Sequence, residues 1–377
     1  MITETTPLGK DFVRLSENIS PEETVFFDIE TTGFAADVTA LYLIGCVFYE
    51  GNEWTLTQWF ADDKESEKAV LEAFLRLVEN KKLLVCYNGS GFDLQYLIKK
   101  FSGHCLNFNE NLYSILDLYR EFAPFKAVLG LDNLKQKTVE NFIGINREDK
   151  FSGGELIKYY SEYLKARFTG SESLKEIYDI LLLHNREDML GLVSLMKLYE
   201  FICVLNDLIN GKYAAETGLK FVHSPDKSKH IQLRIAIDCF SPEMDFLKAT
   251  YRISVVNENA VDSHSFLIIE APIYTGELKY FYPDYKNYYY LPDEDMAIHK
   301  SIASFMREGK REKAKAFNCY TRHKGNFILS PCAEIKPDFK NNYDDKLSYL
   351  RLSENAPVSD ENIIKYAAEV MKYMVKA

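Results

Sequence analysis

Asp28 and Glu30 stand one residue apart at the end of an apolar run, in the stretch VFFDIETTG of residues 25–33. The run predicts a buried strand, and residues i and i+2 of a strand project from the same face. Two like charges held side by side destabilise each other unless a cation lies between them. Oxygen ligands of this kind suit Mg²⁺ or Mn²⁺ rather than zinc. The alternative is a strand end with two solvated acids, and the pair alone does not distinguish this from a metal site.

Asp93 follows a second short apolar run, residues 83–87, which predicts a parallel core strand. The sequence NGSG of residues 88–91 predicts a loop, and the apolar spacing from 94 to 101 predicts a helix that begins at Phe92-Asp93. Asp93 is therefore expected beyond the carboxyl end of a strand, where open α/β sheets place ligands. Acids also favour helix N-termini without any ligand, so this motif alone leaves both interpretations open.

His184 and Asp188 lie four residues apart in a stretch whose apolar positions predict a helix over residues 174–205. Residues at that spacing share one helix face, which would place an imidazole beside a carboxylate as a general base and a metal ligand require. The alternative is an exposed His–Asp pair, worth only about a few tenths of a kcal/mol.

Taken in order, the three motifs resemble those of the DnaQ-like, or DEDD, 3′→5′ exonucleases of the RNase H-like superfamily. The resemblance rests on DIETTG at 28–33, on Asn88-x-x-x-Phe92-Asp93 and on His184-x-x-x-Asp188. It is closest to bacterial stand-alone RNase H-like nuclease domains, whose Leu-x-Leu-Ile-Gly second strand is similar to residues 41–45. It covers roughly residues 20–205. One departure is that the superfamily places a tyrosine three intervening residues before the last aspartate or a histidine four before it, whereas this chain has histidine at the tyrosine spacing.

The resemblance implies phosphodiester hydrolysis with two divalent ions, Mg²⁺ or Mn²⁺, about 4 Å apart. Asp28, Glu30 and Asp188 would hold one ion, Asp28 would bridge to the second, and Asp93 would act through that ion's waters. His184 would take the proton from the attacking water, because histidine exchanges protons near neutral pH.

The same motifs supply weaker candidates around these residues. Asn88 would orient the loop that carries Asp93 or contact the substrate strand, and Thr31 and Phe92 are further substrate-binding candidates. Asp117 precedes a predicted helix at a place where related domains carry an acid. We expect Asp117 to cap that helix or to support the site rather than to bind a metal directly.

Length and composition indicate two domains in a reducing compartment. A chain of 377 residues with 47% hydrophobic residues is long for one domain and can fill two cores. Its seven scattered cysteines (46, 86, 105, 203, 239, 319 and 332) show no CxxC pair, which favours free thiols. Residues 1–23 contain no signal-peptide pattern, and no apolar run approaches the roughly 20 residues of a membrane span. We therefore expect a cytoplasmic protein with no membrane partner and no nucleotide cofactor; the sequence leaves the oligomeric state open.

Charge is divided unevenly between the two predicted domains. Residues 1–210 carry 21 Lys+Arg and 33 Asp+Glu, a net charge of −12, whereas residues 211–377 carry 24 and 23, a net charge of +1. The segment 300–330 holds only two acids but eight basic residues: Lys300, Arg307, Lys310, Arg311, Lys313, Lys315, Arg322 and Lys324. Such a segment could hold a phosphate backbone, or it could be a solvated helix face and hairpin.

The predicted organisation is an α/β RNase H-like domain over 1–210, with a mixed sheet flanked by helices, and a smaller α+β domain over 211–377. The alternating pattern of the second domain predicts a mainly antiparallel sheet. Its predicted elements are strands over 232–238, 251–256, 265–270 and 278–282, a helix over 293–308, a hairpin turn at 324–326 and a helix over 360–376.

Aromatic residues are concentrated in the second domain, in the stretch YFYPDYKNYYY of residues 280–290. Exposed aromatic rings between basic residues can stack unpaired bases, at roughly 1–3 kcal/mol each. Tyrosine is also common in strands because it packs well there, and packing is the simpler expectation.

These observations together predict a metal-dependent nuclease that acts on nucleic acid, and the resemblance implies that it is a 3′→5′ exonuclease on single strands. Two alternatives stay open: a nucleic-acid-binding protein that keeps the fold without catalysis, and an endonuclease specific for a nucleic-acid structure. The choice between DNA and RNA depends on contacts to the 2′-hydroxyl, which no residue here predicts.

Overall fold

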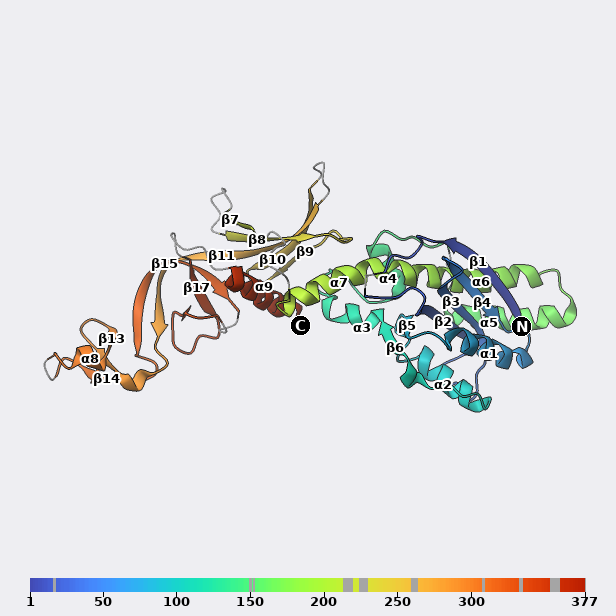
Figure 1. Cartoon of the computed structure of the whole chain (residues 1–377), viewed down its shortest axis with the longest axis horizontal. Helices are drawn as coiled ribbons and strands as arrows, with labels where there is room; N and C mark the ends of the chain where they lie inside the picture. Colours follow the sequence, from blue (N-terminus) through green and yellow to red (C-terminus); the bar gives the residue numbers. More distant parts are fainter. Residues whose placement is uncertain are drawn as a thin grey trace. The chain divides into compact units, whose positions relative to one another are not determined.

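The computed structural model describes residues 1–15, 18–148, 151, 153–212, 220–223, 230–258, 264–306, 309–331, 335–352 and 360–376. Two compact units make up the chain. The N-terminal unit comprises Met1–Lys126 and Leu131–Ile202, and the C-terminal unit comprises Ala127–Gly130 and Cys203–Ala377. Each unit has its own sheet (Figure 1).

The N-terminal unit is built on a six-stranded sheet in the order β1-β4-β3-β2-β5-β6. The pairs β1–β4, β4–β3 and β3–β2 are antiparallel, whereas β2–β5 and β5–β6 are parallel, so the predicted mixed sheet is confirmed. The edge strand β1 was not predicted, because its residues are mostly polar. The strands are β1 (Ile2–Gly9), β2 (Thr24–Thr31), β3 (Leu41–Glu50), β4 (Glu53–Phe60), β5 (Leu83–Cys86) and β6 (Ser114–Asp117).

Helices cover both faces of this sheet (Figure 1). Alternation along β2 sends Val25, Phe27 and Ile29 into a core with α1 and α2, while Asp28 and Glu30 face α6. A second core joins the other face to α5 and α6. The helices are α1 (Glu67–Val78), α2 (Asp93–Gly103), α3 (Leu118–Phe122), α4 (Gln136–Phe142), α5 (Gly153–Thr169), α6 (Leu174–Ser194) and α7 (Met196–Ile209). The single helix predicted over 174–205 is thus two helices that meet at Leu195.

The C-terminal unit contains an eight-stranded sheet whose described pairings are all antiparallel, as predicted. The predicted C-terminal helix is also confirmed. The elements are β7 (Lys220–His223), β8 (His230–Ile237), β9 (Asp245–Lys248), β10 (Tyr251–Glu258), β11 (His264–Phe281), β15 (Tyr320–Ser330), β16 (Asp338–Phe339), β17 (Ser348–Leu352) and α9 (Asp360–Val375).

The two strands predicted over 265–270 and 278–282 are one strand, β11. Pro272 lies at the point where pairing with β8 ends, and Ile273 begins the pairing with β15. A proline that cannot donate to a ladder is tolerated at such a change of partner. The hairpin turn predicted at 324–326 is wrong for a related reason: Gly325 lies inside β15, opposite Gly276 of β11.

The helix predicted over 293–308 is also wrong. In its place are β13 (Met296–His299) and the one-turn α8 (Lys300–Ala303), and Arg307 and Glu308 fall outside the described residues. β13 pairs with β12 (Tyr288–Leu291), which also pairs with β14 (Glu312–Lys313) in a small separate sheet. Tertiary strand pairing has therefore overridden the local helical pattern.

Two further features concern the apolar helices and the cysteines. Within the described part of the chain, no helix combines the length and apolar character that a membrane span needs. The six cysteines that the structure describes are free, as expected, and Cys332 lies outside the described residues.

Candidate active site

Three segments of the N-terminal unit bring the predicted site residues together. β2 carries Asp28 and Glu30, α2 begins with Asp93, and α6 carries His184 and Asp188. The backbone N–H of Ile29 donates to Asp93 Oδ1 at 3.3 Å, which ties the start of α2 to β2.

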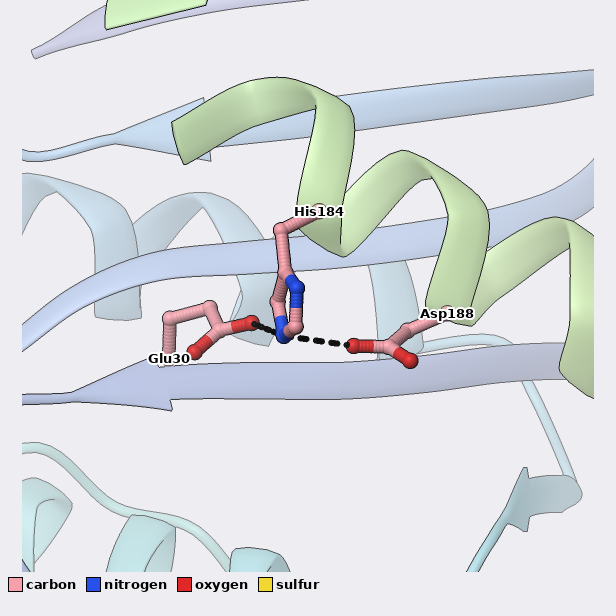
Figure 2. A group of neighbouring side chains, drawn as sticks. All are labelled: Glu30, His184 and Asp188. Atoms are coloured by element: carbon pink, nitrogen blue, oxygen red, sulfur yellow. Dashed lines mark ion pairs between the residues drawn. The ribbon is translucent and has the colours of Figure 1, made fainter. Parts of the chain in front are cut away.

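Figure 2 shows the His184 side chain between two carboxylates. Its Nε2 lies 3.1 Å from Asp188 Oδ2 and 3.6 Å from Glu30 Oε1. The His184 residue is 6% exposed, and Glu30 is 8% exposed. The helical i,i+4 spacing therefore places the histidine beside the last aspartate even though it is the spacing that the superfamily uses for tyrosine.

The electrostatics of the site show that its carboxylates act on one another. Burial raises the pKa of Asp28 well above its ordinary value, and the negative charges of Asp188, Asp93 and Glu30 raise it further. Burial also raises the pKa of Asp93, to about 7. Ionised carboxylates in this position require positive charge nearby, which a divalent cation would provide.

Asn185 holds Asp28 in place. Its Nδ2 donates to Asp28 Oδ2 at 3.0 Å, and its Oδ1 accepts from Gln58 Nε2 at 2.9 Å. Asn185 is fully buried. Gly45 of β3 pairs with Asp28 of β2 and leaves room for the Asn185 side chain, because a Cβ on Gly45 would overlap the Asn185 amide. The sequence analysis did not predict a role for Asn185, although its position directly after His184 in the third motif could have indicated one.

Arg147 engages Asp188 from the other side. Its guanidinium forms ion pairs with Asp188 Oδ1 and with Glu140, and Nη2 donates to Glu140 Oε1 at 2.6 Å. Glu140 is fully buried and the Arg147 side chain is 6% exposed. Gly191 of α6 makes room for this pair, because a Cβ there would overlap the Glu140 carboxylate. Arg147 was also missed, since it lies in a loop outside every motif.

Asp117 organises the loop between β5 and α2. Its carboxylate accepts from the backbone N–H groups of Asn88 at 2.7 Å and Ser90 at 3.1 Å, and from that of Tyr119 at 3.2 Å at the start of α3. It caps α3, as expected for a supporting residue, and also shapes the loop that leads to Asp93.

The predicted substrate-binding residues lie around this centre. The Thr31 hydroxyl donates to the Gly33 carbonyl at 2.9 Å, Asn88 is exposed with φ of 58°, and Phe92 is half-buried. The ring of Phe92 lies 5.8 Å from that of Phe34, which is 91% exposed and which sequence reasoning did not single out. The two rings border a pocket of about 170 Å³, together with Gly91, Gln95, Tyr96 and Lys99.

A metal ion would find suitable donors in this site. Ligand atoms of Glu30, His184 and Asp188 all lie within 4.8 Å of one another. The carboxylate oxygens of Glu30 and Asp188 are the kind of ligand that Mg²⁺ and Mn²⁺ prefer, and the imidazole beside them is left for proton transfer. The donor chemistry and the mutual repulsion of the acids therefore fit a divalent cation.

Comparisons with known proteins concern mainly the same region. The family model of the RNase H superfamily matches residues 25–200. No curated protein matches the chain in sequence. Among solved structures, the family B DNA polymerase from the hyperthermophilic archaeon Pyrobaculum calidifontis is 13% identical, with a TM-score of 0.40 over 94% of this chain and 46% of that one. The zinc-bound E. coli ExoI–ssDNA complex is 12% identical, with a TM-score of 0.28 over 56% of this chain and 53% of that one.

The chain spans about half the length of those two solved chains. The family match covers most of the six-stranded sheet and the helices on its two faces. The resemblance found in the three motifs is thereby confirmed at the level of the superfamily. Residues 25–200 form a domain of the RNase H superfamily.

Proposed function

We propose that this protein is a metal-dependent nuclease that hydrolyses phosphodiester bonds of nucleic acid, and that it acts as a 3′→5′ exonuclease. One observation carries the proposal: four carboxylates from three separate segments meet beside a buried imidazole, where burial and the charges of the other three acids raise the pKa of Asp28. Clustered acids lower the stability of the folded chain unless they bind cations. Metal binding would therefore explain why the acids are gathered here.

Each residue of the site has a part in this proposal. Asp28, Glu30 and Asp188 would hold one divalent ion, Asp28 would also hold the second, and Asp93 would act through that ion's waters. When bound, the two ions would supply positive charge to the attacking and leaving oxygens of an in-line displacement. His184 Nε2 would accept the proton of the attacking water, since it already lies within reach of the carboxylates that surround that position.

The surrounding residues keep the acids in place. Asn185 fixes the Asp28 carboxylate, and Arg147 fixes that of Asp188 while it offsets part of the negative charge. Asp117 fixes the loop that leads to Asp93. Groups that are already oriented in the free protein need no rearrangement during the reaction, which is the main source of electrostatic catalysis.

The exposed rim supports a nucleic-acid substrate. Phe34 offers an exposed ring beside Phe92, and a base could stack on it. Lys99 in the same pocket could bind a phosphate, and Asn88 and Thr31 are proposed to contact the substrate strand.

A protein that binds nucleic acid without cleaving it is the alternative from another class. That alternative would need no group to orient the acids, yet Asn185 and the Arg147–Glu140 pair orient two of them from within the core. An endonuclease would use the same site and would differ in how it admits the strand.

The test is degradation of end-labelled single-stranded DNA and RNA in Mg²⁺ or Mn²⁺, with EDTA as the metal-free control. Wild type would be compared with Asp28→Asn and with Glu176→Gln, an exposed acid in the first turn of α6. Stepwise shortening that is lost in Asp28→Asn and kept in Glu176→Gln would support the exonuclease. Cleavage of a circular single strand would instead identify an endonuclease, and binding without cleavage would identify the non-catalytic alternative.

A further inference from the structure

The tyrosines of the small sheet in the C-terminal unit fall into two groups. Tyr282, Tyr285, Tyr288 and Tyr290 pack around a buried cluster of Ala297, Ala314 and Cys319. Tyr289 points to the opposite face of β12, because successive residues of a strand alternate. The guanidinium carbon of Arg311 lies 5.0 Å from the centre of the Tyr289 ring. Packing against the buried cluster therefore explains the presence of four of these tyrosines, but not that of Tyr289.

A pocket of about 380 Å³ opens beside Tyr289. Its walls are three half-buried tyrosines and three exposed lysines: Tyr285, Tyr288, Tyr289, Lys286, Lys300 and Lys313. Among the lining residues that the structure describes, none is a carboxylate. Lys300 Nζ donates to Asn287 Oδ1 at 2.8 Å, which is a neutral partner. Three ammonium groups around one pocket repel one another unless an anion lies between them.

Three other basic residues of this region, Lys310, Arg322 and Lys324, have acidic partners. Lys310 Nζ lies 2.7 Å from Asp293 Oδ2, and Arg322 pairs with Glu277 at 3.0 Å. Lys324 is also paired with Glu277, at 4.0 Å. Lys300 and Lys313 of this segment line the pocket instead, and Lys313 lies directly opposite Tyr289 across β12 and β14.

We propose that this lysine–tyrosine pocket, formed by the six residues above, is a binding site for single-stranded nucleic acid. The lysines would contact the phosphates, and Tyr289, supported by Arg311, would stack on a base. The Tyr289 ring favours nucleic acid over a lipid headgroup, because an unpaired base has a flat face that can stack on the ring and a headgroup does not. A volume of about 380 Å³ is within the range of roughly 300–1,000 Å³ that ligand pockets have.

The experiment measures binding of fluorescently labelled 20-nucleotide oligo-dT and oligo-U to the full chain by anisotropy, in EDTA so that metal-dependent cleavage is prevented. The triple variant Lys286→Gln, Lys300→Gln, Lys313→Gln should bind more weakly. Each phosphate contact adds about 0.7 to the slope of log Kd against log salt for single strands, so the triple variant should lose about 2 from that slope.

Tyr289→Leu should raise Kd at least about fivefold with the salt slope unchanged, and Tyr289→Phe should keep most of the affinity. Lys310→Gln is the matched control: it removes one lysine from the same region, but one that already pairs with Asp293, so the slope should not change. Thermal unfolding of each variant verifies that it is folded, and the three single-lysine variants replace the triple if it is not.

An unchanged affinity and slope in the lysine variants would overturn the proposal. So would binding of phosphatidylserine vesicles that depends on the lysines while oligonucleotide binding does not, because the pocket would then be a lipid-headgroup site. The result is independent of the nuclease proposal. Cleavage of bis(p-nitrophenyl) phosphate with Mn²⁺ by wild type and by the pocket variants tests the carboxylate site alone.

Discussion

The carboxylate site of the N-terminal unit and the lysine–tyrosine pocket of the C-terminal unit both gather like charges, but in different surroundings. The acids are buried or partly buried and are fixed by Asn185, Arg147 and backbone donors. The lysines are exposed and line an open pocket. Buried like charges are costly and need a tightly held counter-ion, whereas exposed ones are screened by water and salt. On the two proposals made above, the first site carries out chemistry and the second makes weaker, salt-dependent contact.

The charges of the two parts of the sequence agree with this division. A net charge of −12 over residues 1–210 repels a polyanion, whereas residues 211–377 are close to neutral and contain a local basic excess. On the two proposals made above, the acidic unit would need its cations, and help from another surface, to approach nucleic acid.

The largest effect is expected for Asp28→Asn, which tests whether the buried charges serve catalysis. Cleavage should fall at least about a thousandfold, because divalent ions supply several kcal/mol of transition-state stabilisation. The same variant should raise the Tm of the metal-free protein, because it removes repulsion from Asp93, Asp188 and Glu30. A variant that loses activity and also lowers the metal-free Tm would show that Asp28 has a structural role instead.

Arg147→Met should destabilise the protein by about 3–5 kcal/mol, because it leaves Glu140 charged and buried without its partner. Denaturant unfolding measures this loss. The double variant Arg147→Met, Glu140→Gln should recover part of the stability, since no buried charge is then left unpaired. A double variant as unstable as the single one would contradict the ion-pair explanation.

The buried carboxylate site should make the stability of the metal-free protein depend on pH, whereas the exposed lysines of the pocket should not. The folded pKa of Asp93 is raised to about 7 from 3.8 and that of Asp28 is also raised, so the folded state holds more protons than the unfolded one between those values. The metal-free protein should therefore lose stability, on the order of a few kcal/mol, as pH rises from about 4 to about 7. Chemical unfolding in EDTA at several pH values tests this, and Asp93→Asn should flatten the curve.

Added Mn²⁺ should reverse that loss. The ions bind the ionised carboxylates of the folded state, so stability at pH 7 and above should increase with metal concentration. The lysine–tyrosine pocket should contribute no such dependence, because its lysines lie on the surface. Equal stability with and without Mn²⁺ at pH 7 would contradict the proposed metal site.

The smallest effect is expected for Phe34→Ala. Loss of one stacking ring should cost about 1–3 kcal/mol in substrate binding, seen as a higher KM with kcat and Tm nearly unchanged, since Phe34 is 91% exposed. Val38→Ala, 84% exposed and in the same loop, is the matched control. An equal effect of both variants would assign the change to the loop rather than to stacking.

In the N-terminal unit, much of the candidate site could be predicted from the sequence because each motif is local. The strand period places Asp28 and Glu30 on one face, and the helix period places His184 beside Asp188. Asn185 and Arg147 could not be predicted in the same way. Arg147 lies 41 residues from Asp188 and meets it only because α4 and its following loop pack against α6.

In the C-terminal unit, local patterns predicted the strand class and the last helix but not how the strands join. Pro272 and Gly276 are typical of a break, yet β11 continues through both because it exchanges one partner strand for another there. The residues around 296–299 carry a helical pattern but form a strand, because β12 offers a pairing edge.

The sequence by itself determined the identities and spacings of the catalytic candidates, the mixed and antiparallel classes of the two sheets and the uneven distribution of charge. These follow from short-range periodicity and composition, which need no knowledge of distant contacts. The tertiary structure alone decided which groups orient the acids, which tyrosine lies on the face opposite the packed cluster and which lysines line the pocket. Those outcomes depend on residues far apart in the chain that meet only after folding, because burial and pairing are properties of the packed molecule.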